Sequence, residues 1–366
     1  MNLNNSSHAN ETLRETSGLA AHTKITLWCI LLVWSLLANL LVIAVVYCNQ
    51  NLKTNMNYLI VNMAVSDLLI PLIGIPLMIS NNILRPGEWL VDGTIGEALC
   101  KLVSFLSAIS PYISSISLLI ITVQRFIAVV YPSHRQILTC KTGWFLMMSF
   151  PWLVAMALFS PSFYTNRLSK EWGYTMCEYS WSPAFDPKKA LIIFLSIIAL
   201  VGFIIPLIAI IILYTIIHYK LRKSLNNVKE IIAIEMIRSR QQRNRRIFYM
   251  SITIIVVFTI CWSPLGVLHF LFWLQPPSVL SMDKDIIRNM FFCFTYLWYF
   301  LAAINPCIYF LFLRDFRQGL KRLACRKTTN EQTYTLCVCC VRTVATDATS
   351  KKDPTCTPPH INTTSF

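Results

Sequence analysis

The chain has 366 residues, of which 55% are hydrophobic and only 13% are charged, and its formal net charge is +15. A soluble protein carries roughly 25% charged residues to cover its surface, so this composition excludes an ordinary pair of soluble domains. A mean hydropathy of +0.55 indicates a chain that lies largely within a membrane.

Seven stretches of the chain are almost free of charged residues: 25–47, 54–84, 102–124, 142–166, 190–217, 247–275 and 289–313. Each is longer than the ~20 residues that an α-helix needs to cross the hydrocarbon core. Helices are expected because lipid offers no hydrogen-bond partners for backbone amides. The sequence therefore predicts an all-α membrane protein, a seven-transmembrane helix bundle over residues 25–313. The alternative is a set of buried helices in a large soluble protein.

Residues 1–24 are polar and lack the apolar run of a cleavable signal peptide, so they are expected to form an N-terminal tail. Lys and Arg gather on the other side of the predicted membrane, with nine of them in segment 218–246. The positive-inside rule then predicts an extracellular N-terminus in the plasma membrane. Most of the net charge is then expected on the cytoplasmic face, where it would meet anionic membrane lipids. Nucleic acid is not an expected partner. Asn4, Asn5 and Asn10 stand in sequons and are expected to be glycosylated.

The chain has thirteen cysteines, but only Cys100 and Cys177 fall clearly on the predicted outer side. The others lie in helices or in the cytoplasm, where thiols stay reduced. We therefore expect these two to form a disulfide, which would tie the loop 166–189 to the top of the third helix.

Asp67, in "NMAVSDLLIP", is the one clear ionisable residue inside a predicted span. Such a residue is costly in lipid and needs a polar partner or a cation. Asn39, Ser114 and Asn305 lie in other predicted helices and are the candidate partners. Asp67 is then either a hydrogen-bonded structural residue or part of a hydrated ion or proton site.

Pro206, Pro264 and Pro306 fall within predicted spans, where each removes a backbone hydrogen bond and favours a kink. In "FTICWSP", Phe258 and Trp262 are one turn apart and share a helix face beside Pro264. These kinks are either packing devices or the positions at which a helix moves.

Several of these residues belong to motifs that occur in order along the chain: "LANLLV", "AVSDLL", the two outer cysteines, "QRFIAVVYP", Trp152, Pro206 with Tyr214, "CWSP" and "NPCIY". With one signature in each helix, the chain resembles the rhodopsin-like (class A) family of G-protein-coupled receptors over about residues 25–325. The resemblance implies an extracellular ligand and a heterotrimeric G protein as partners, and no enzymatic activity.

The resemblance implies that Arg125 is caged at rest and helps to receive the G protein, with Tyr214 and Tyr309 moving towards it. The chain departs from the family at the triplet Gln124-Arg125-Phe126, since Asp or Glu usually precedes the arginine. Asn244 also replaces the acid that often caps the sixth helix. A charge-assisted hydrogen bond is roughly twice as strong as a neutral one, so we hypothesise raised ligand-independent signalling. The alternatives are that another group cages the arginine, or that the protein is a non-coupling decoy.

The resemblance also places an allosteric sodium ion at Asp67, Ser114 and Asn305, with Trp262 above. Ala302 replaces one usual polar partner. The chain lacks the amine-pairing Asp at Ser107 and the retinal Lys at Tyr299, which disfavours a monoamine receptor and a light sensor.

Residues that the resemblance assigns to the ligand pocket are Ser107, Pro111, Trp262, Thr295 and Trp298 below, with Tyr179, Trp181, His269 and Phe291 above. Aromatic and charged groups in the loop "NRLSKEWGYTMCEYSWSP" suit a peptide ligand, and the motifs resemble those of neuropeptide receptors. One alternative is a small non-amine ligand. Another is that the aromatic residues of this loop form a membrane-interface belt. His269 is either a pH sensor or a packing residue.

Residues 314–325, "RDFRQGLKRLAC", place Phe316, Leu320 and Leu323 at helical spacing between basic residues. This pattern predicts a short amphipathic eighth helix on the membrane surface. Cys325 is a palmitoylation candidate. Residues 326–366 are Thr-rich, are expected to be disordered, and offer sites for receptor kinases and arrestin. A seven-helix enzyme or transporter would need further acids, His clusters or an inverted repeat within the spans, and the sequence shows none.

Overall fold

The computed structural model describes residues 3–84, 88–132, 141–171, 174–227, 231–274 and 282–324. Within this part of the chain, seven helical spans are long and apolar enough to cross a membrane, which confirms the predicted fold. The helices are α1 Leu3–Cys48, α2 Asn55–Asp67, α3 Ile75–Ile83, α4 Gly93–Val130, α5 Lys141–Phe159, α6 Ser162–Thr165, α7 Pro187–Ala199, α8 Ile205–Asn226, α9 Ile231–Leu274, α11 Lys284–Phe312 and α12 Arg314–Ala324. The pairs α2–α3, α5–α6 and α7–α8 each make one span.

Two helices extend well past the predicted apolar windows. The first window begins at residue 25, but α1 begins at Leu3, so most of the expected N-terminal tail continues the helix. The sixth window begins at residue 247, but α9 begins at Ile231. The difference arises because hydropathy marks only the part of a helix that lipid surrounds. Residues such as Arg, Gln and Glu have high helix propensity and continue a helix into water.

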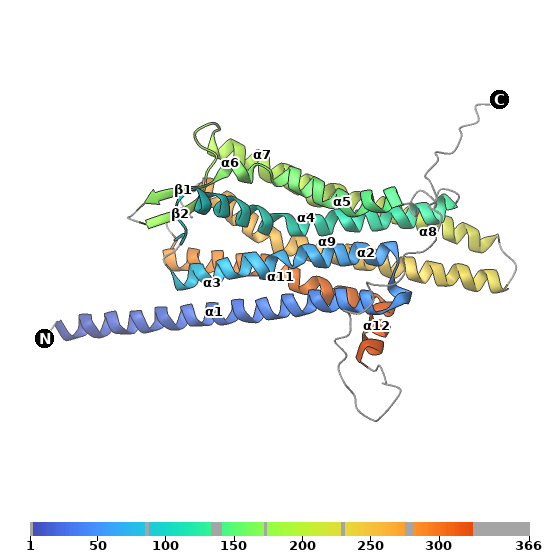
Figure 1. The fold of residues 1–366 in the computed structure, drawn as a ribbon, viewed down its shortest axis with the longest axis horizontal. Coiled ribbons are helices and arrows are strands. Elements are labelled where there is room, and N and C mark those ends of the chain that lie inside the picture. The colour runs from blue at the N-terminus through green and yellow to red at the C-terminus, as the bar shows by residue number, and fades with distance from the viewer. Residues whose placement is uncertain are drawn as a thin grey trace.

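The central helix of the bundle is α4, which contacts α2, α5, α8 and α9. α11 packs between α1 and α9 (Figure 1). The start of α1 projects from the end of the bundle that carries strands β1 and β2, and α12 lies at the opposite end (Figure 1).

The bundle is apolar outside and partly polar inside, as lipid requires. Large apolar side chains on the outer faces are exposed, among them Leu37, Phe145, Ile193 and Leu311. The central helix α4 instead buries a series of serines: Ser107, Ser110, Ser114, Ser115 and Ser117. Hydroxyl groups of this kind make hydrogen bonds between helices inside a membrane protein.

The second and fifth spans each contain a π-helical turn, at Ile70–Gly74 and at Leu200–Ile204. In both turns a backbone N–H bonds to the carbonyl five residues earlier, so each turn holds one residue more than an α-helix would. Pro71 lies within the first turn and Pro206 follows the second.

Both π-helical turns bring a glycine against a tyrosine ring of another helix. A Cβ atom on Gly74 would lie 2.4 Å from the ring of Tyr299, and one on Gly202 would lie 2.3 Å from the ring of Tyr112. Any larger side chain would displace the ring, so these positions require glycine.

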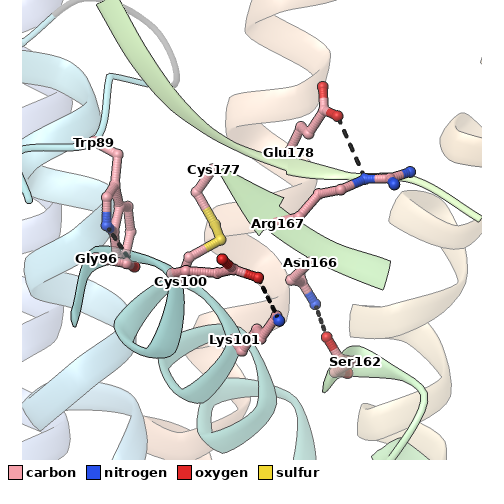
Figure 2. Close-up of a disulfide and its surroundings, with 10 residues drawn as sticks. Trp89, Gly96, Cys100, Lys101, Ser162, Asn166, Arg167, Cys177 and Glu178 are labelled. Carbon is pink, nitrogen blue, oxygen red and sulfur yellow. Dashed lines mark hydrogen bonds and ion pairs between the residues drawn. A yellow bond between two sulfur atoms is a disulfide. The ribbon is translucent and has the colours of Figure 1, made fainter. Parts of the chain in front are cut away.

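The loop between the fourth and fifth spans contains an antiparallel hairpin of β1 Asn166–Glu171 and β2 Tyr174–Tyr179. Figure 2 shows the predicted disulfide, in which Cys177 of β2 is bonded to Cys100 of α4. An ion pair between Arg167 and Glu178, with Nε and Oε1 3.6 Å apart, also joins the two strands. The purely helical prediction missed this hairpin, because its short strands carry polar residues and no alternating apolar pattern.

The predicted eighth helix is confirmed as α12. Phe316 is fully buried, and the Gly319 backbone lies against the end of α1, where its carbonyl accepts a hydrogen bond of 3.3 Å from Asn49. A Cβ on Gly319 would lie 2.8 Å from Leu52 and 2.9 Å from Val45. Cys325 and residues 326–366 lie outside the described residues. The backbone at the sequons of Asn4, Asn5 and Asn10 belongs to α1.

Candidate functional site

A cavity of about 490 Å³ lies between α4, α7, α9 and α11, and the hairpin forms part of its wall. The residues that line it are Ser104, Ala108, Tyr112, Phe159, Ser162, Asn166, Tyr179, Leu191, Phe194, Leu195, Ile198, Trp262, Leu265, Gly266, His269, Phe291 and Trp298. We call this space the outer cavity, because it lies beside the disulfide end of the bundle.

Helical spacing explains why these residues share one space. Ser104, Ala108 and Tyr112 are four residues apart and form one face of α4. The same periodicity brings Trp262 and His269 of α9 to the cavity, because seven residues make almost two turns. Five predicted pocket residues line the outer cavity: Tyr179, Trp262, His269, Phe291 and Trp298.

Four other predicted pocket residues do not line the outer cavity. Ser107 and Pro111 are one position away from the cavity face of α4, and the Ser107 hydroxyl donates a hydrogen bond of 2.8 Å to the Val103 carbonyl. Trp181 packs against Phe194, with ring centroids 5.6 Å apart. The fourth is Thr295 of α11.

Trp181 instead supports a residue of the cavity wall. Its indole Nε1 donates a hydrogen bond of 2.8 Å to the hydroxyl of Tyr179. Partial burial raises the pKa of Tyr179 to about 12, although the hydrogen bond from Trp181 acts in the opposite direction. The phenol therefore keeps its proton at neutral pH and presents a neutral donor.

Trp262 joins the outer cavity to a cluster of aromatic rings below it. The ring centroids of Phe203 and Trp262 are 5.3 Å apart, and those of Phe203 and Phe258 are 4.2 Å apart. Phe258 and Trp262, which the sequence predicts to share a helix face, therefore both pack against Phe203. Phe203 belongs to the fifth span and is close to Pro206 in sequence. Pro264 lies inside α9, one turn below His269. A shift of Trp262 would have to move this cluster.

The buried Asp67 carboxylate lies deeper in the bundle and accepts three hydrogen bonds. Ser110 donates at 2.8 Å and Ser114 at 3.4 Å to Oδ1, while the Asn305 amide donates at 2.8 Å to Oδ2. The predicted partners Ser114 and Asn305 are thus in place. Pro306, the next residue, lies inside α11, where its nitrogen cannot donate a backbone hydrogen bond.

Asn39 is the predicted partner that does not reach Asp67. Its amide nitrogen donates to the carbonyls of Ser35 and Ala302, each at 2.9 Å. Ser110 takes the remaining place. Its role could not be predicted from the sequence, because it is one of several serines on α4. The side-chain oxygen of Asn305 is buried and has no hydrogen-bond partner in the described structure.

At the inner end of α4, Arg125 is half-buried and its Nη2 lies 2.8 Å from the sulfur of Met56. The preceding residue, Gln124, donates from Nε2 to the sulfur of Met147, also at 2.8 Å. Asn244 is buried at the inner end of α9. Phe126, the third residue of the triplet, packs its ring 5.9 Å from that of Tyr131.

The two predicted switch tyrosines are both buried near this inner end. Tyr214 packs against Phe248 of α9, with ring centroids 4.9 Å apart. The hydroxyl of Tyr309 donates to the sulfur of Met63, at 3.7 Å. Both rings therefore belong to the core in this structure.

A seven-helix bundle with an outer cavity, a buried polar core and an inner arginine is the architecture of a membrane receptor. The family model described as "7 transmembrane receptor (rhodopsin family)" matches residues 38–309, and the chain belongs to this family. Rhodopsin-family receptors are multi-pass membrane proteins of the cell surface and are not enzymes.

Curated relatives are similar along most of the chain. A QRFP-like peptide receptor of Branchiostoma floridae is 24% identical over 85% of this chain and 80% of its own length. Neuropeptide FF receptor 1 of Rattus norvegicus is 27% identical over 83% of this chain and 69% of its own. The substance-K receptor of Canis lupus familiaris is 27% identical over 85% and 79%. The chain thus falls among the receptors of the neuropeptide branch.

Proposed function

We propose that the chain is a plasma-membrane receptor that binds an extracellular peptide in the outer cavity and activates heterotrimeric G proteins at its opposite end. The observation that carries this proposal is the position of the cavity, beside the disulfide and far from Arg125. The names of two relatives supply the peptide class, since one is a peptide receptor and the other a neuropeptide receptor. The N-terminus then lies outside, because the described parts of the basic segment, 218–227 and 231–246, lie at the arginine end.

The route from ligand to G protein runs through contacts described above. A ligand that presses on Trp262 moves Phe203 and Phe258, and Phe258 also packs 5.7 Å from Tyr112 of the central helix. The inner halves of α8 and α9 then separate, which exposes Arg125 to the G protein. Ligand binding shifts this equilibrium only by its difference in affinity for the two arrangements.

The polar core fits a sodium ion, which would lower the affinity for an agonist by stabilising the resting arrangement. Asp67 supplies a carboxylate, Ser110 and Ser114 supply hydroxyl oxygens, and the unpartnered oxygen of Asn305 is a further candidate ligand. Oxygen donors of this kind suit a hard cation. Replacing NaCl by choline chloride should raise agonist affinity in the wild type but not in Asp67→Asn.

The function is tested by screening secreted peptides against cells that express the chain, with a panel of G proteins as readout. The predicted result is a saturable response to at least one peptide that Trp262→Ala abolishes at equal surface expression. A saturable response to non-peptide ligands alone would contradict the peptide class. Epitope tags test the orientation: an N-terminal tag should bind antibody on intact cells, and a C-terminal tag only after permeabilisation.

A non-coupling receptor of the same fold is the second candidate, and Gln124 and Asn244 are the observations that favour it. Neither residue supplies the acid that the family usually places at these positions. Peptide binding to the purified chain without activation of any G protein in the panel would support this decoy function instead.

A further inference from the structure

A second cavity, of about 360 Å³, lies between the inner parts of α8 and α9, at the end of the bundle opposite the hairpin (Figure 1). The two helices pack against each other here, and both contribute to the wall. None of the residues that line this space lines the outer cavity. We call it the inner groove.

The inner groove lies at the depth where the apolar core of a membrane would end. The fifth apolar window of the sequence ends at residue 217 and the sixth begins at residue 247, and groove residues lie on both sides of these limits. Tyr219 and Tyr249 are 67% and 44% exposed at this level. Exposed tyrosines mark the boundary between hydrocarbon and lipid headgroups, so the groove is open to the headgroup region of one leaflet.

The half of the groove nearer the membrane centre is largely apolar. Phe248 and Tyr249 of α9 form it together with Thr215 of α8. Exposed apolar side chains continue this surface along both helices, at one or two turns from a groove residue: Ile208, Ile211 and Val256. A hydrocarbon chain could therefore extend from the groove along the outer faces of α8 and α9.

The other half of the groove is polar and contains a cation. Arg245 is exposed, and its guanidinium carbon lies 5.4 Å from the centre of the Tyr249 ring. No carboxylate of the described residues pairs with Arg245, and no Asp or Glu is among the residues that line the groove. Beside it, Nδ1 of His218 and Nε2 of Gln241 lie 3.5 Å apart and connect α8 to α9.

Asn244 adds an unused hydrogen-bonding group to the polar half. It lines the groove and is only 7% exposed, yet its amide bonds to no other residue in the described parts of the chain. A buried amide without a partner is costly, which favours an occupant with hydrogen-bond acceptors. Phosphate oxygens are such acceptors and form strong charge-assisted bonds with arginine.

We propose that the inner groove binds one anionic phospholipid of the leaflet that faces the G protein. Arg245 and Asn244 bind the phosphate, and an acyl chain covers the apolar half. A free phosphate would leave that half uncovered. A choline lipid would bring its own cation next to Arg245, whereas an anionic lipid keeps a net negative charge there.

The lipid would hold α8 and α9 together, because the walls of the groove come from both helices and separate when the helices do. An occupant that binds only the joined arrangement shifts the equilibrium towards it. This effect on signalling rests on the proposed function, in which separation of the two helices exposes Arg125. Binding of the lipid does not depend on that function.

Native mass spectrometry of the purified full chain tests binding, with phosphatidylserine and phosphatidylcholine as matched probes. Glycerophosphoserine, the soluble headgroup, is added as a competitor. The expected result is one retained phosphatidylserine, bound at least about tenfold more tightly than phosphatidylcholine and not displaced by the headgroup. Equal affinity for both lipids, or full displacement by the headgroup alone, would overturn the proposal.

Two pairs of variants locate the lipid. Arg245→Gln should weaken binding by about tenfold, because it removes the charge-assisted bonds. Arg243→Gln removes the same charge from the opposite face of α9, so equal losses would mean diffuse attraction to a basic surface and would overturn the site. Thr215→Trp should weaken binding by filling the groove without changing its charge, whereas Thr215→Val should not. Unchanged binding in both Arg245→Gln and Thr215→Trp would also overturn it.

The effect on signalling is tested in nanodiscs made with or without phosphatidylserine. The measured quantity is the ratio of basal G-protein nucleotide exchange in Arg245→Gln to that in the wild type. This ratio should be about threefold higher in discs with the anionic lipid, since only there does the wild type lose activity to the bound lipid. Equal ratios in both discs would overturn the clamping role. Lipid binding at the groove without activation of any G protein would instead support the site and contradict the proposed receptor function.

Discussion

Gln124 places a neutral amide next to the inner arginine, where a carboxylate would hold a guanidinium more tightly. In the structure this amide donates to the sulfur of Met147, which is a weak acceptor. Position 124 therefore offers Arg125 an amide in place of the carboxylate that the family usually has there.

Gln124→Glu should lower ligand-independent signalling, because a carboxylate at this position attracts Arg125 and stabilises the resting arrangement. If the new interaction is worth about 1 kcal/mol more than the old, basal activity falls about fivefold. Basal G-protein activation in cells, corrected for surface expression, measures this effect. Asn244→Asp is the matched test at the second position, and unchanged activity in both variants would show that other groups hold the arginine.

Gly202 lies in the second π-helical turn, directly under the ring of Tyr112. Gly202→Ala should destabilise the receptor by about 1–3 kcal/mol, because the added methyl group would overlap that ring. Gly266→Ala is a suitable control, since its Cβ would lie 3.4 Å from the Trp262 ring, close to ordinary contact. Thermal unfolding of the purified receptor should therefore show a clearly lower midpoint for Gly202→Ala alone. Equal midpoints would mean that the Tyr112 ring moves aside at little cost.

For single residues, the sequence predicted the depth of a side chain in the membrane better than the direction in which the side chain points. Motifs such as "CWSP" fix how far along a helix a residue lies, and Trp262 and His269 both line the outer cavity. The face depends on helix rotation, which packing of the whole bundle determines. Ser107 and Pro111 therefore lie one residue away from the face of α4 that lines the outer cavity and carries Ala108.

α12 is the element whose position depends most on a single residue. Gly319 packs against Val45 and Leu52 without a side chain, and Asn49 bonds to its backbone. Alanine is a better helix former than glycine by about 1 kcal/mol, so substitution would stabilise an isolated helix. In the receptor this gain in helix propensity opposes the steric overlap of an added methyl group with Val45 and Leu52.

Gly319→Ala should weaken the docking of α12, because overlap with Val45 and Leu52 costs about 1–3 kcal/mol and exceeds the gain in helix propensity. Thermal unfolding of the purified receptor and maximal G-protein activation should both decrease. Gln318→Ala, at an exposed neighbouring position, changes helix propensity without this overlap and should leave both unchanged. A more stable Gly319→Ala variant would mean that α12 can shift without loss.

The existence of each spanning helix could be predicted from charge-free windows, because lipid imposes this pattern directly. The helix ends could not, since residues such as those of 231–246 continue α9 without any apolar signal. The β1–β2 hairpin also escaped prediction, because its short strands carry polar residues without an alternating apolar pattern. Its anchoring by a disulfide leaves little trace in local sequence.

On the scale of the molecule, the Cys100–Cys177 disulfide closes a long loop, since the two residues are 77 positions apart. It holds the hairpin, and with it Asn166 and Tyr179, over the outer cavity. The ligand site therefore depends on a covalent bond at the rim as well as on helix packing.

Cys100→Ser and Cys177→Ser should each lower stability by about 2–5 kcal/mol and reduce peptide binding. The double variant should be no worse than either single one, because both remove the same bond. Surface expression and peptide binding in cells measure the effect, with Cys29→Ser, an exposed free cysteine of α1, as the control. Losses that add in the double variant would mean that the two sulfurs act separately.

The extra residue in the turn Leu200–Ile204 separates two segments of one span, one that lines the outer cavity and one that reaches the inner end. The segment before it, α7, carries Leu191, Phe194 and Ile198 of the cavity wall, and the segment after it, α8, carries Tyr214. Deleting one residue from the turn would rotate one segment against the other by about 100°. Such a change would rotate the cavity wall that a ligand contacts, while the inner segment with Tyr214 keeps its packing. Ligand specificity could then change in evolution without a change at the inner end.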